Sequence, residues 1–400
     1  MLTQYQNLLL QLNSLTTFRG VLQLPAVQAL RELLGSLGKD PSEAMQAYGT
    51  LLYEVREAGF SNLSDYCADH LKYDESAFGR ACAQGKNDAF FTEAARKDVE
   101  IIMGAAGLDF AGLKACMAES FPAQSAMIEV LPELPCGKAL TFEALMDSFL
   151  HNGVGIFARG RAFLWENGAL SMVRNPDHID EAQMIGYTWQ RQEVMKNTAQ
   201  LLAGKSANNV LLHGDSGTGK SATIKSLINV PEFYNLRVVE VAKSSLGELT
   251  QLVRLVSGHT QKFIIYIDDL TFEREDKGYS ALKTALEGGL ENRPENVAIY
   301  VTSNRRHMVR ETFADRQGGD VHREETIQER TSLSERFGLR IVYLSLNQKE
   351  YLNMVEIMAR QAGLQMDPEQ LRREANQWEI QHGGRTPRVA RQFIDSLHEV

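Results

Sequence analysis

One stretch of this 400-residue chain combines residue types that could bind phosphate. Residues 214–221, G-D-S-G-T-G-K-S, match the phosphate-binding loop pattern G-x-x-x-x-G-K-[ST] without a mismatch. Glycine lets the backbone adopt positive φ and approach an anion closely, and the N–H groups of the loop and of the following helix attract that anion. We therefore expect a site for the phosphates of a nucleoside triphosphate.

The two residues that close this loop have defined expected roles. Lys220 would reach the β- and γ-phosphates, and the Ser221 hydroxyl would ligate Mg²⁺. The apolar run 210–213 predicts a buried strand before the loop, and the apolar spacing of residues 224–228 predicts a helix after it. ATP and Mg²⁺ are the expected ligands. The expected nucleotide-binding residues are Gly214, Asp215, Ser216, Gly217, Thr218, Gly219, Lys220 and Ser221.

Two carboxylates that follow the next apolar run could serve a metal and an attacking water. The sequence F-I-I-Y-I-D-D-L predicts a buried strand that ends at Asp268 and Asp269. Adjacent like charges are costly unless a cation offsets them. We expect Asp268 to hold Mg²⁺ through water and Asp269 to orient or deprotonate the attacking water. Two solvated loop acids are the alternative, and Glu273 is an alternative base.

A further expected strand, residues 297–301, leads into polar residues. Asn304, which follows it, could hydrogen-bond the γ-phosphate or its attacking water, or it could cap the chain locally. A basic group follows and could contact nucleic acid, although a solvated basic edge is the favoured interpretation. These basic residues are Arg305, Arg306, His307 and Arg310.

Arginine near the last expected strand could stabilise the charge of a transferring phosphate. Arg336, in the sequence S-E-R-F-G, would reach a nucleotide held by a neighbouring subunit. Arg330 is the second candidate for this role, and a structural salt bridge is the alternative.

The sequence G-G-R-T-P-R near the C-terminus offers another arginine for the same phosphates. Thr386 as the helix cap and Pro387 as the first helical residue predict a helix start. Arg388 would then be held rigidly and directed at the nucleotide. Arg385 and Arg391 are less well placed, and a surface arginine is the alternative for Arg388.

The overall composition is that of an ordinary globular protein. With a net charge of −9 and a pI near 5.6, a uniformly basic nucleic-acid binder is not expected. The cysteines form no C-x-x-C pair, so we expect reduced, buried thiols and no zinc site. The sequence has neither a signal-peptide pattern nor an apolar run near the ~20 residues of a membrane span, which predicts a cytoplasmic protein without membrane association. The cysteines are Cys67, Cys82, Cys116 and Cys136.

Apolar spacing divides the chain into four expected parts. Residues 1–150 have helical periodicity and predict an all-α N-terminal domain. Residues 151–182 predict a β-hairpin around Asn167-Gly168 and a linker. Residues 183–344 alternate strands with helices, which predicts a parallel αβα sheet, and residues 345–400 predict a helical lid. The expected strands of the sheet are 210–213, 237–241, 263–267, 297–301 and 340–344.

The order of these motifs resembles that of AAA+ ATPases from about residue 183 to the C-terminus. G-D-S-G-T-G-K-S, I-D-D-L-T-F, V-T-S-N-R-R-H and L-S-E-R-F-G-L resemble a bacterial group within that superfamily, domain of unknown function 815. The resemblance implies a P-loop NTPase with a five-stranded αβα core and a helical lid. ATP would be hydrolysed at the interfaces of a ring or other homo-oligomer.

The resemblance also assigns roles to the candidate residues. Lys220 and Ser221 match Walker A, and Asp268 and Asp269 match Walker B. Asn304 matches sensor 1, Arg336 the arginine finger and Arg388 sensor 2. Most AAA+ motors have glutamate where this chain has Asp269, whose shorter side chain argues against fast hydrolysis but not against binding.

Three functional hypotheses follow. The first is an oligomeric ATPase whose N-terminal domain recruits an unidentified protein client that the ATP cycle moves or remodels. The second is a slowly hydrolysing ATP switch or loader-type module, and in one version of it, which is not the favoured one, the basic residues after Asn304 contact DNA. Phosphate transfer to a small molecule is disfavoured, because the two arginine candidates suit an assembly better.

Overall fold

The protein is described by a computed structural model that covers residues 2–179, 184–270, 277–287, 294–304 and 333–397. The chain divides into two compact units, Met1–Arg159 and Gly160–Val400. The finer boundaries expected at 150, 182 and 344 stay predictions. Some candidates named above lie outside the described residues, and these are Glu273, Arg305, Arg306, His307, Arg310 and Arg330.

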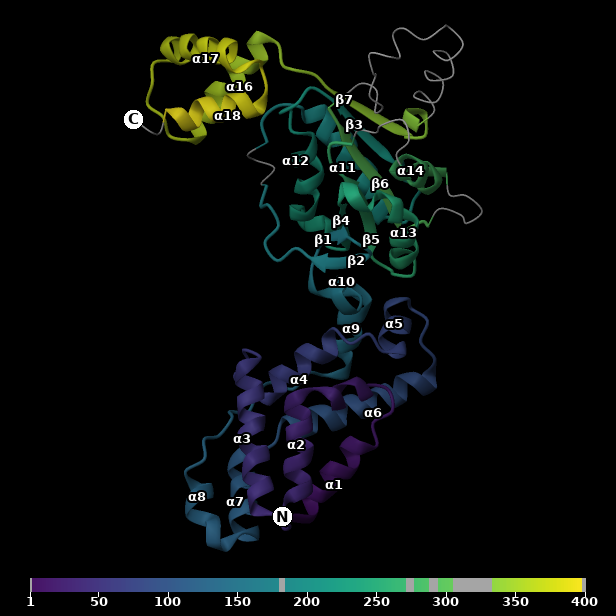
Figure 1. Cartoon of the computed structure of the whole chain (residues 1–400), viewed down its shortest axis with the longest axis vertical. Helices are drawn as coiled ribbons and strands as arrows, with labels where there is room; N and C mark the ends of the chain where they lie inside the picture. The colour runs from purple at the N-terminus through teal and green to yellow at the C-terminus, as the bar shows by residue number, and fades with distance from the viewer. Residues whose placement is uncertain (1, 180–183, 271–276, 288–293, 305–332, 398–400) are drawn as a thin grey trace. The chain divides into compact units, whose positions relative to one another are not determined.

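The described residues of the first unit form helices joined by turns and loops, which confirms the expected helical N-terminal region (Figure 1). The helical spacing of Val27, Leu30 and Leu33 puts them on one face of α2, where each is at most 2% exposed. The helices are α1 (Leu2–Asn13), η1 (Arg19–Gln23), α2 (Pro25–Ser36), α3 (Pro41–Glu57), α4 (Leu63–Lys72), α5 (Ala77–Ala83), α6 (Ala89–Ala106), α7 (Phe110–Ser120), η2 (Pro122–Gln124), α8 (Ser125–Glu129), α9 (Phe142–Asn152) and α10 (Gly155–Arg159).

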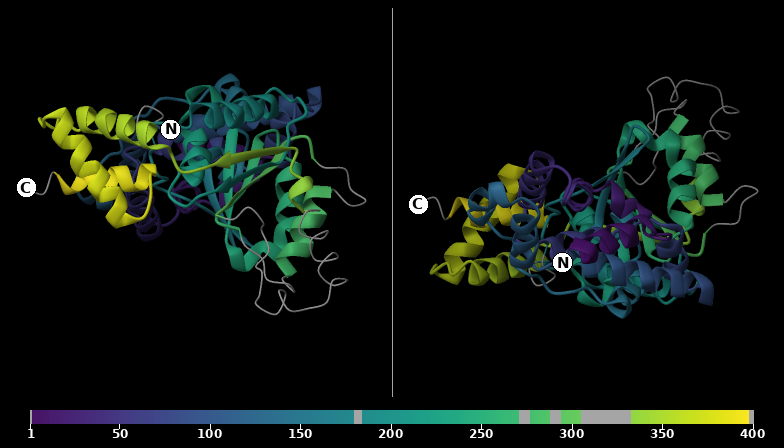
Figure 2. Two further views of the ribbon diagram at one scale, coloured as in Figure 1. Left: turned by 90° about the horizontal axis from the view of Figure 1, so that it is seen from above. Right: turned by 90° about the horizontal axis from the view of Figure 1, so that it is seen from below.

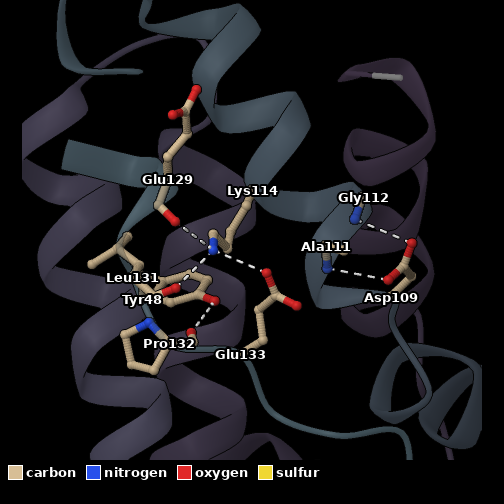
Figure 3. A network of polar contacts seen from close by, with 9 residues as sticks. All are labelled: Tyr48, Asp109, Ala111, Gly112, Lys114, Glu129, Leu131, Pro132 and Glu133. Atoms are coloured by element: carbon tan, nitrogen blue, oxygen red, sulfur yellow. Dashed lines mark hydrogen bonds and ion pairs between the residues drawn. The ribbon is translucent and has the colours of Figure 1, made fainter. Parts of the chain in front are cut away.

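The Lys114 side chain of α7 binds the end of α8 and the segment that follows it (Figure 3). Its ammonium donates to the carbonyl oxygens of Glu129 at 3.0 Å and Leu131 at 2.7 Å, and it pairs with the Glu133 carboxylate at 2.9 Å. A lysine ammonium has three donors, and three acceptors use them here. This cation therefore stabilises the fold of the unit.

A buried carboxylate joins α6 to the chain after α1. Asp98 is 3% exposed and accepts hydrogen bonds from the backbone N–H groups of Thr16, Thr17 and Phe18 at 2.6–3.2 Å. A buried carboxylate is tolerated only when hydrogen bonds replace its hydration. Asp98 therefore fixes the path of this loop by accepting from three of its backbone donors, of which the Phe18 N–H is buried.

Asp98→Ala should lower the free energy of unfolding of the first unit by about 3 kcal/mol, because buried N–H groups lose their acceptor. Urea unfolding of the full chain, followed by circular dichroism, measures this loss. Tryptophan fluorescence separates the units, since Trp165, Trp189 and Trp378 all lie in the second. Glu100→Ala, at an exposed position of the same helix, is the matched control. A loss no larger than that of the control would contradict this role for Asp98.

The cysteine prediction is confirmed at three positions and wrong at one. Cys67, Cys82 and Cys116 are buried free thiols, whereas Cys136 is exposed. Burial raises the pKa of the Cys67 thiol to about 12, so it stays protonated at neutral pH. The apolar spacing that buries the other three places them on helix faces, while Cys136 lies in the loop between α8 and α9.

No single helix among the described residues is both long and apolar enough to cross a membrane. The pair α6 and α7 passes by length and composition only when taken together, and it is bent by 70°.

The described residues of the second unit form a mixed, mostly parallel sheet of seven strands in the order β2-β1-β4-β5-β6-β3-β7 (Figure 1). The five predicted strands are present and parallel, but the prediction of a five-stranded sheet is wrong, because the hairpin adds two strands to the same sheet. The strands are β1 (Ala162–Glu166), β2 (Ala169–Met172), β3 (Val210–Gly214), β4 (Leu236–Val241), β5 (Lys262–Ile267), β6 (Val297–Ser303) and β7 (Leu339–Tyr343).

The hairpin forms at the predicted turn and then pairs with the sheet. Asn167 and Gly168 have φ of 52° and 73°, as a tight turn between twisted strands requires. Strand β1 runs parallel to β4, with Phe163 opposite Val239. The indole N–H of Trp165 donates to the Glu248 carboxylate at 3.0 Å, which fixes the hairpin against η6 (Lys243–Glu248).

Helices cover both faces of this sheet (Figures 1 and 2). On one face α11 (Thr188–Leu202) and α12 (Lys220–Lys225) share an apolar core with β5. On the other lie α13 (Leu249–Ser257) and α14 (Lys277–Glu287). Short helices η4 (Ser226–Asn229) and η5 (Pro231–Phe233) follow α12, and the C-terminal helices α16 (Gln348–Gln361), α17 (Pro368–His382) and α18 (Pro387–Ser396) pack around a core of their own.

Candidate nucleotide-binding site

The phosphate loop leaves β3 and enters α12 through three glycines with positive φ. Gly214 has φ 131°, and a Cβ atom there would lie 2.1 Å from the carbonyl oxygen of Tyr343. Gly217 and Gly219 have φ of 75° and 93°, which side-chain-bearing residues rarely adopt. All three glycines therefore have the positive φ that the sequence pattern predicted, and Gly214 and Gly217 also lie close to neighbouring groups.

Lys220 lies at the centre of this loop and is 6% exposed. Its ammonium donates to the carbonyl oxygens of Gly214 at 3.1 Å and Asp215 at 2.6 Å. Burial lowers the pKa of Lys220 below its ordinary value, although the nearby carboxylates of Asp215, Asp269 and Asp268 counteract this effect. A third donor of the ammonium remains for a phosphate oxygen.

Asp268 accepts hydrogen bonds from two hydroxyl groups that belong to other elements. Ser221 Oγ and Thr302 Oγ1 both donate to Asp268 Oδ1 at 2.6 Å. Burial alone would raise the pKa of Asp268, but hydrogen bonds from hydroxyl groups outweigh it and hold this pKa below the ordinary value. The carboxylate is ionised at neutral pH, and its oxygens and the Ser221 hydroxyl are the hard ligands that Mg²⁺ prefers. The residues present fit this metal.

Asp269 is held in a left-handed backbone conformation with φ 46°. Its N–H donates to Thr302 Oγ1 at 2.8 Å, and its carboxylate accepts from Asn304 Nδ2 at 2.7 Å. Lys243 Nζ lies 3.6 Å from the other carboxylate oxygen. Positive φ is uncommon for residues other than glycine and is costly unless neighbours maintain it. These contacts fix the direction in which the Asp269 side chain leaves the strand.

The C-terminal helices bring a further arginine to the loop. The Arg388 N–H donates to the Gly217 carbonyl at 3.2 Å, and a Cβ atom on Gly217 would meet Arg388 Cβ at 3.1 Å. A pocket of about 670 Å³ lies here between the sheet and these helices, within the usual range for ligand sites. Tyr187, Arg191 and Arg391 line it together with Arg388.

Most of the predicted site residues line this pocket. Gly214 and Asp215 are not among its described lining residues, and Asp215 instead bonds Ser345. Arg336 is not among them either. The predicted residues that do line the pocket are Ser216, Gly217, Thr218, Gly219, Lys220, Ser221, Asp268, Asp269, Asn304 and Arg388.

The sequence analysis missed several residues of the site. Thr302 bridges both acids, and its place two residues before Asn304 at a strand end was a usable signal. Lys243 and Tyr187 come from distant segments, and no local pattern marks them. Tyr187 has φ 52°, stacks on Tyr343 with ring centroids 5.1 Å apart, and donates its hydroxyl hydrogen to the Leu344 carbonyl.

Residues 158–399 match the family described as "Protein of unknown function (DUF815)". The chain belongs to this family. The match begins just before the hairpin and runs almost to the last residue, so this family includes the hairpin, the sheet and the C-terminal helices. The resemblance to this group drawn from the motifs is thereby confirmed.

No curated protein matches the chain significantly. Among solved structures, a variant of Thermotoga maritima RuvB matches 54% of this chain with 13% identity and a TM-score of 0.36. The match covers 63% of that structure's chain, so this protein spans less than two thirds of its length. A second structure, described as the Thermotoga maritima RuvB Holliday junction branch migration motor, matches 55% of this chain and 72% of its own, with 11% identity and a TM-score of 0.32.

Thr302→Val should weaken binding of Mg²⁺–ATP about tenfold, because the hydroxyl that bridges Asp268 and the Asp269 amide is lost without a change of shape. Calorimetric titration measures the affinity. Thr302→Ser keeps the hydroxyl and should restore most of it, and Thr284→Val, at an exposed position of α14, is the control. Equal affinities for the valine and serine variants would show that the hydroxyl bridge does not matter.

Proposed function

We propose that this protein is an AAA+ ATPase that binds Mg²⁺–ATP in the pocket between sheet and lid and hydrolyses it. The proposal rests on one observation: Asp268 accepts hydrogen bonds from Ser221 of the phosphate loop and from Thr302. In P-loop NTPases, the phosphate loop and an acid at the end of a neighbouring strand hold the phosphates and Mg²⁺ during phosphate transfer.

Binding would use the groups nearest the loop. The backbone N–H groups and Lys220 would hold the phosphates, and Ser221 with Asp268 would hold Mg²⁺, which neutralises phosphate charge when bound. Arg388 would add a second cation from the lid. Its N–H already bonds the Gly217 carbonyl, so the loop and the arginine are positioned together.

The proposed reaction is attack of water on the γ-phosphorus, with cleavage of its bond to the β,γ-bridging oxygen to give ADP and phosphate. The Asp269 carboxylate would orient this water and take up its proton. The Asn304 amide, 2.7 Å from that carboxylate, would fix its direction. Arg388 would stabilise charge on the γ-phosphate.

Two features support slow turnover, as in a nucleotide switch. Aspartate is one methylene shorter than the glutamate of most AAA+ motors, so its carboxylate stays nearer the strand. Asp269 is also engaged by Asn304 and by Lys243, and both contacts compete with a water for the same oxygens. We therefore propose a hydrolysis rate limited by release of Asp269 from these partners.

The position of Arg336 supports the proposal that two subunits together form the complete site. It follows Leu333 in the short helical turn before β7 and is not among the described residues that line the pocket of its own chain. A guanidinium donated to a neighbour's γ-phosphate would couple hydrolysis to assembly. The partners proposed are thus other copies of the chain, and a protein client that the helical first unit recruits.

A mixing experiment should show whether the site is shared. Arg336→Ala and Asp269→Asn should each reduce ATP turnover by about a hundredfold or more. Mixed in equal amounts, the two inactive variants should regain part of the wild-type rate, because some interfaces pair an intact Asp269 with an intact Arg336. Turnover and oligomeric mass are measured against protein concentration. Mixed assemblies without any regained activity would exclude Arg336 as a group donated in trans.

Asp269→Asn also separates a motor from a switch. The amide cannot accept a proton, so turnover should collapse while Mg²⁺–ATP still binds within a few-fold of wild type. A remodelling ATPase would lose its biological effect in this variant, whereas a pure ATP-state switch would keep it. Undiminished turnover in Asp269→Asn would show that another residue is the base. Lys220→Ala, which should bind no ATP, is the control.

A further inference from the structure

Asp215 places a carboxylate within a loop whose backbone attracts anions. A carboxylate that faced bound phosphates would repel them, because nearby like charges disfavour each other. The structure turns this side chain elsewhere, because Asp215 Oδ2 accepts from the Ser345 N–H at 2.7 Å and from the Ser345 hydroxyl at 2.8 Å. The charge of Asp215 is thus engaged by a segment outside the loop.

Ser345 lies in the connection between the sheet and the C-terminal helices. Strand β7 ends at Tyr343 and α16 begins at Gln348. The Asp215 N–H also donates to the Tyr343 carbonyl at 2.8 Å, and Gly214 packs so closely on that carbonyl that no Cβ fits. Residues 214–215 and 343–345 are therefore joined through backbone and side chain together.

The same connection bonds the segment that carries Arg388. The Leu346 N–H donates to the Arg385 carbonyl at 2.9 Å, and the Arg388 N–H donates to the Gly217 carbonyl at 3.2 Å. Hydrogen bonds therefore join the loop to the connection, the connection to the lid, and the lid back to the loop. Among these hydrogen bonds, the Asp215–Ser345 contact involves a charged side chain.

We propose that Asp215 is a positioning residue that, through Ser345, holds the lid so that Arg388 faces the phosphate loop. Nucleotide binding and lid position then depend on each other through this contact. The inference rests on the proposed function, because it takes the phosphates of a nucleotide as the ligand of the loop.

The direction of this coupling follows from charge. Phosphates in the loop repel the Asp215 carboxylate, and the Ser345 donors stabilise it on the side away from the pocket. Phosphate binding therefore strengthens the Asp215–Ser345 contact, and by thermodynamic reciprocity a formed contact raises nucleotide affinity. The lid is held most firmly when a nucleotide is bound.

Hydrogen exchange of the full chain, with and without Mg²⁺–ATP, tests the contact directly. Asp215→Ala removes the acceptor of the Ser345 N–H. Faster exchange of the Ser345 amide would therefore report only the loss of this acceptor. The amides of Leu346 and Arg388 keep their own acceptors, and they should exchange roughly tenfold to a hundredfold faster in Asp215→Ala because the lid is released. Asp395→Ala, at an exposed position of α18, should change neither amide.

Two further variants weaken the Asp215–Ser345 contact without removing it. Asp215→Asn keeps an oxygen acceptor without the charge, and Ser345→Ala removes one of the two donors, so both should give intermediate exchange rates. Thermal unfolding shows whether each variant is folded. Should Asp215→Ala not fold, Asp215→Asn and Ser345→Ala still decide, because unchanged exchange at Leu346 and Arg388 in both would overturn the proposal.

ATP turnover shows whether Asp215 acts through Arg388. Asp215→Ala alone should lower turnover about tenfold, and in an Arg388→Ala background it should have little further effect, because residues in one contact network are not additive. If the effects of the two substitutions on turnover multiplied, the proposal that Asp215 acts through Arg388 would be wrong. If wild type bound no ATP, the proposed function would fail, but exchange without nucleotide would still decide whether Asp215 holds the lid.

Discussion

The hydrogen bonds that Asp268 accepts from Ser221 and Thr302 join α12, the end of β5 and β6, and the candidate nucleotide site depends on this junction. It forms because β3, β5 and β6 are parallel and in register, with Val301 opposite both Leu211 and Ile267. Parallel strands end at the same edge, so the residues that follow them meet there. The junction keeps Asp268 ionised beside the phosphate loop, which is the condition for holding a metal.

The same edge holds Asp269 in a conformation that costs energy. Its positive φ is maintained by the Thr302 hydroxyl and by Asn304, and its carboxylate is also near Lys243. A carboxylate with this many partners is well oriented, and these partners compete with a water for its oxygens. These contacts support the proposal of a slow ATPase whose turnover waits on assembly or a client.

The hairpin supplies none of the described residues that line the pocket. The hairpin extends the sheet by pairing β1 with β4, and Trp165 and Glu248 fix it there. Within the first unit, the buried carboxylate of Asp98 and the partly buried ammonium of Lys114 are used by the unit's own backbone. The C-terminal helices differ, because the Arg388 N–H bonds the Gly217 carbonyl of the phosphate loop directly. Asp215 of the same loop bonds Ser345 in the connection that leads to these helices.

The sequence by itself determined the phosphate loop, the two acids and Asn304, because local spacing places these residues at strand ends. It also determined the five parallel strands and the turn at Asn167. Only tertiary structure decided that the hairpin joins the sheet, that Thr302 bridges both acids, and that Lys243 and Tyr187 reach the site. The physical reason is that these contacts connect segments far apart in the chain, whose pairing depends on strand order and register and leaves no periodic signal in either segment.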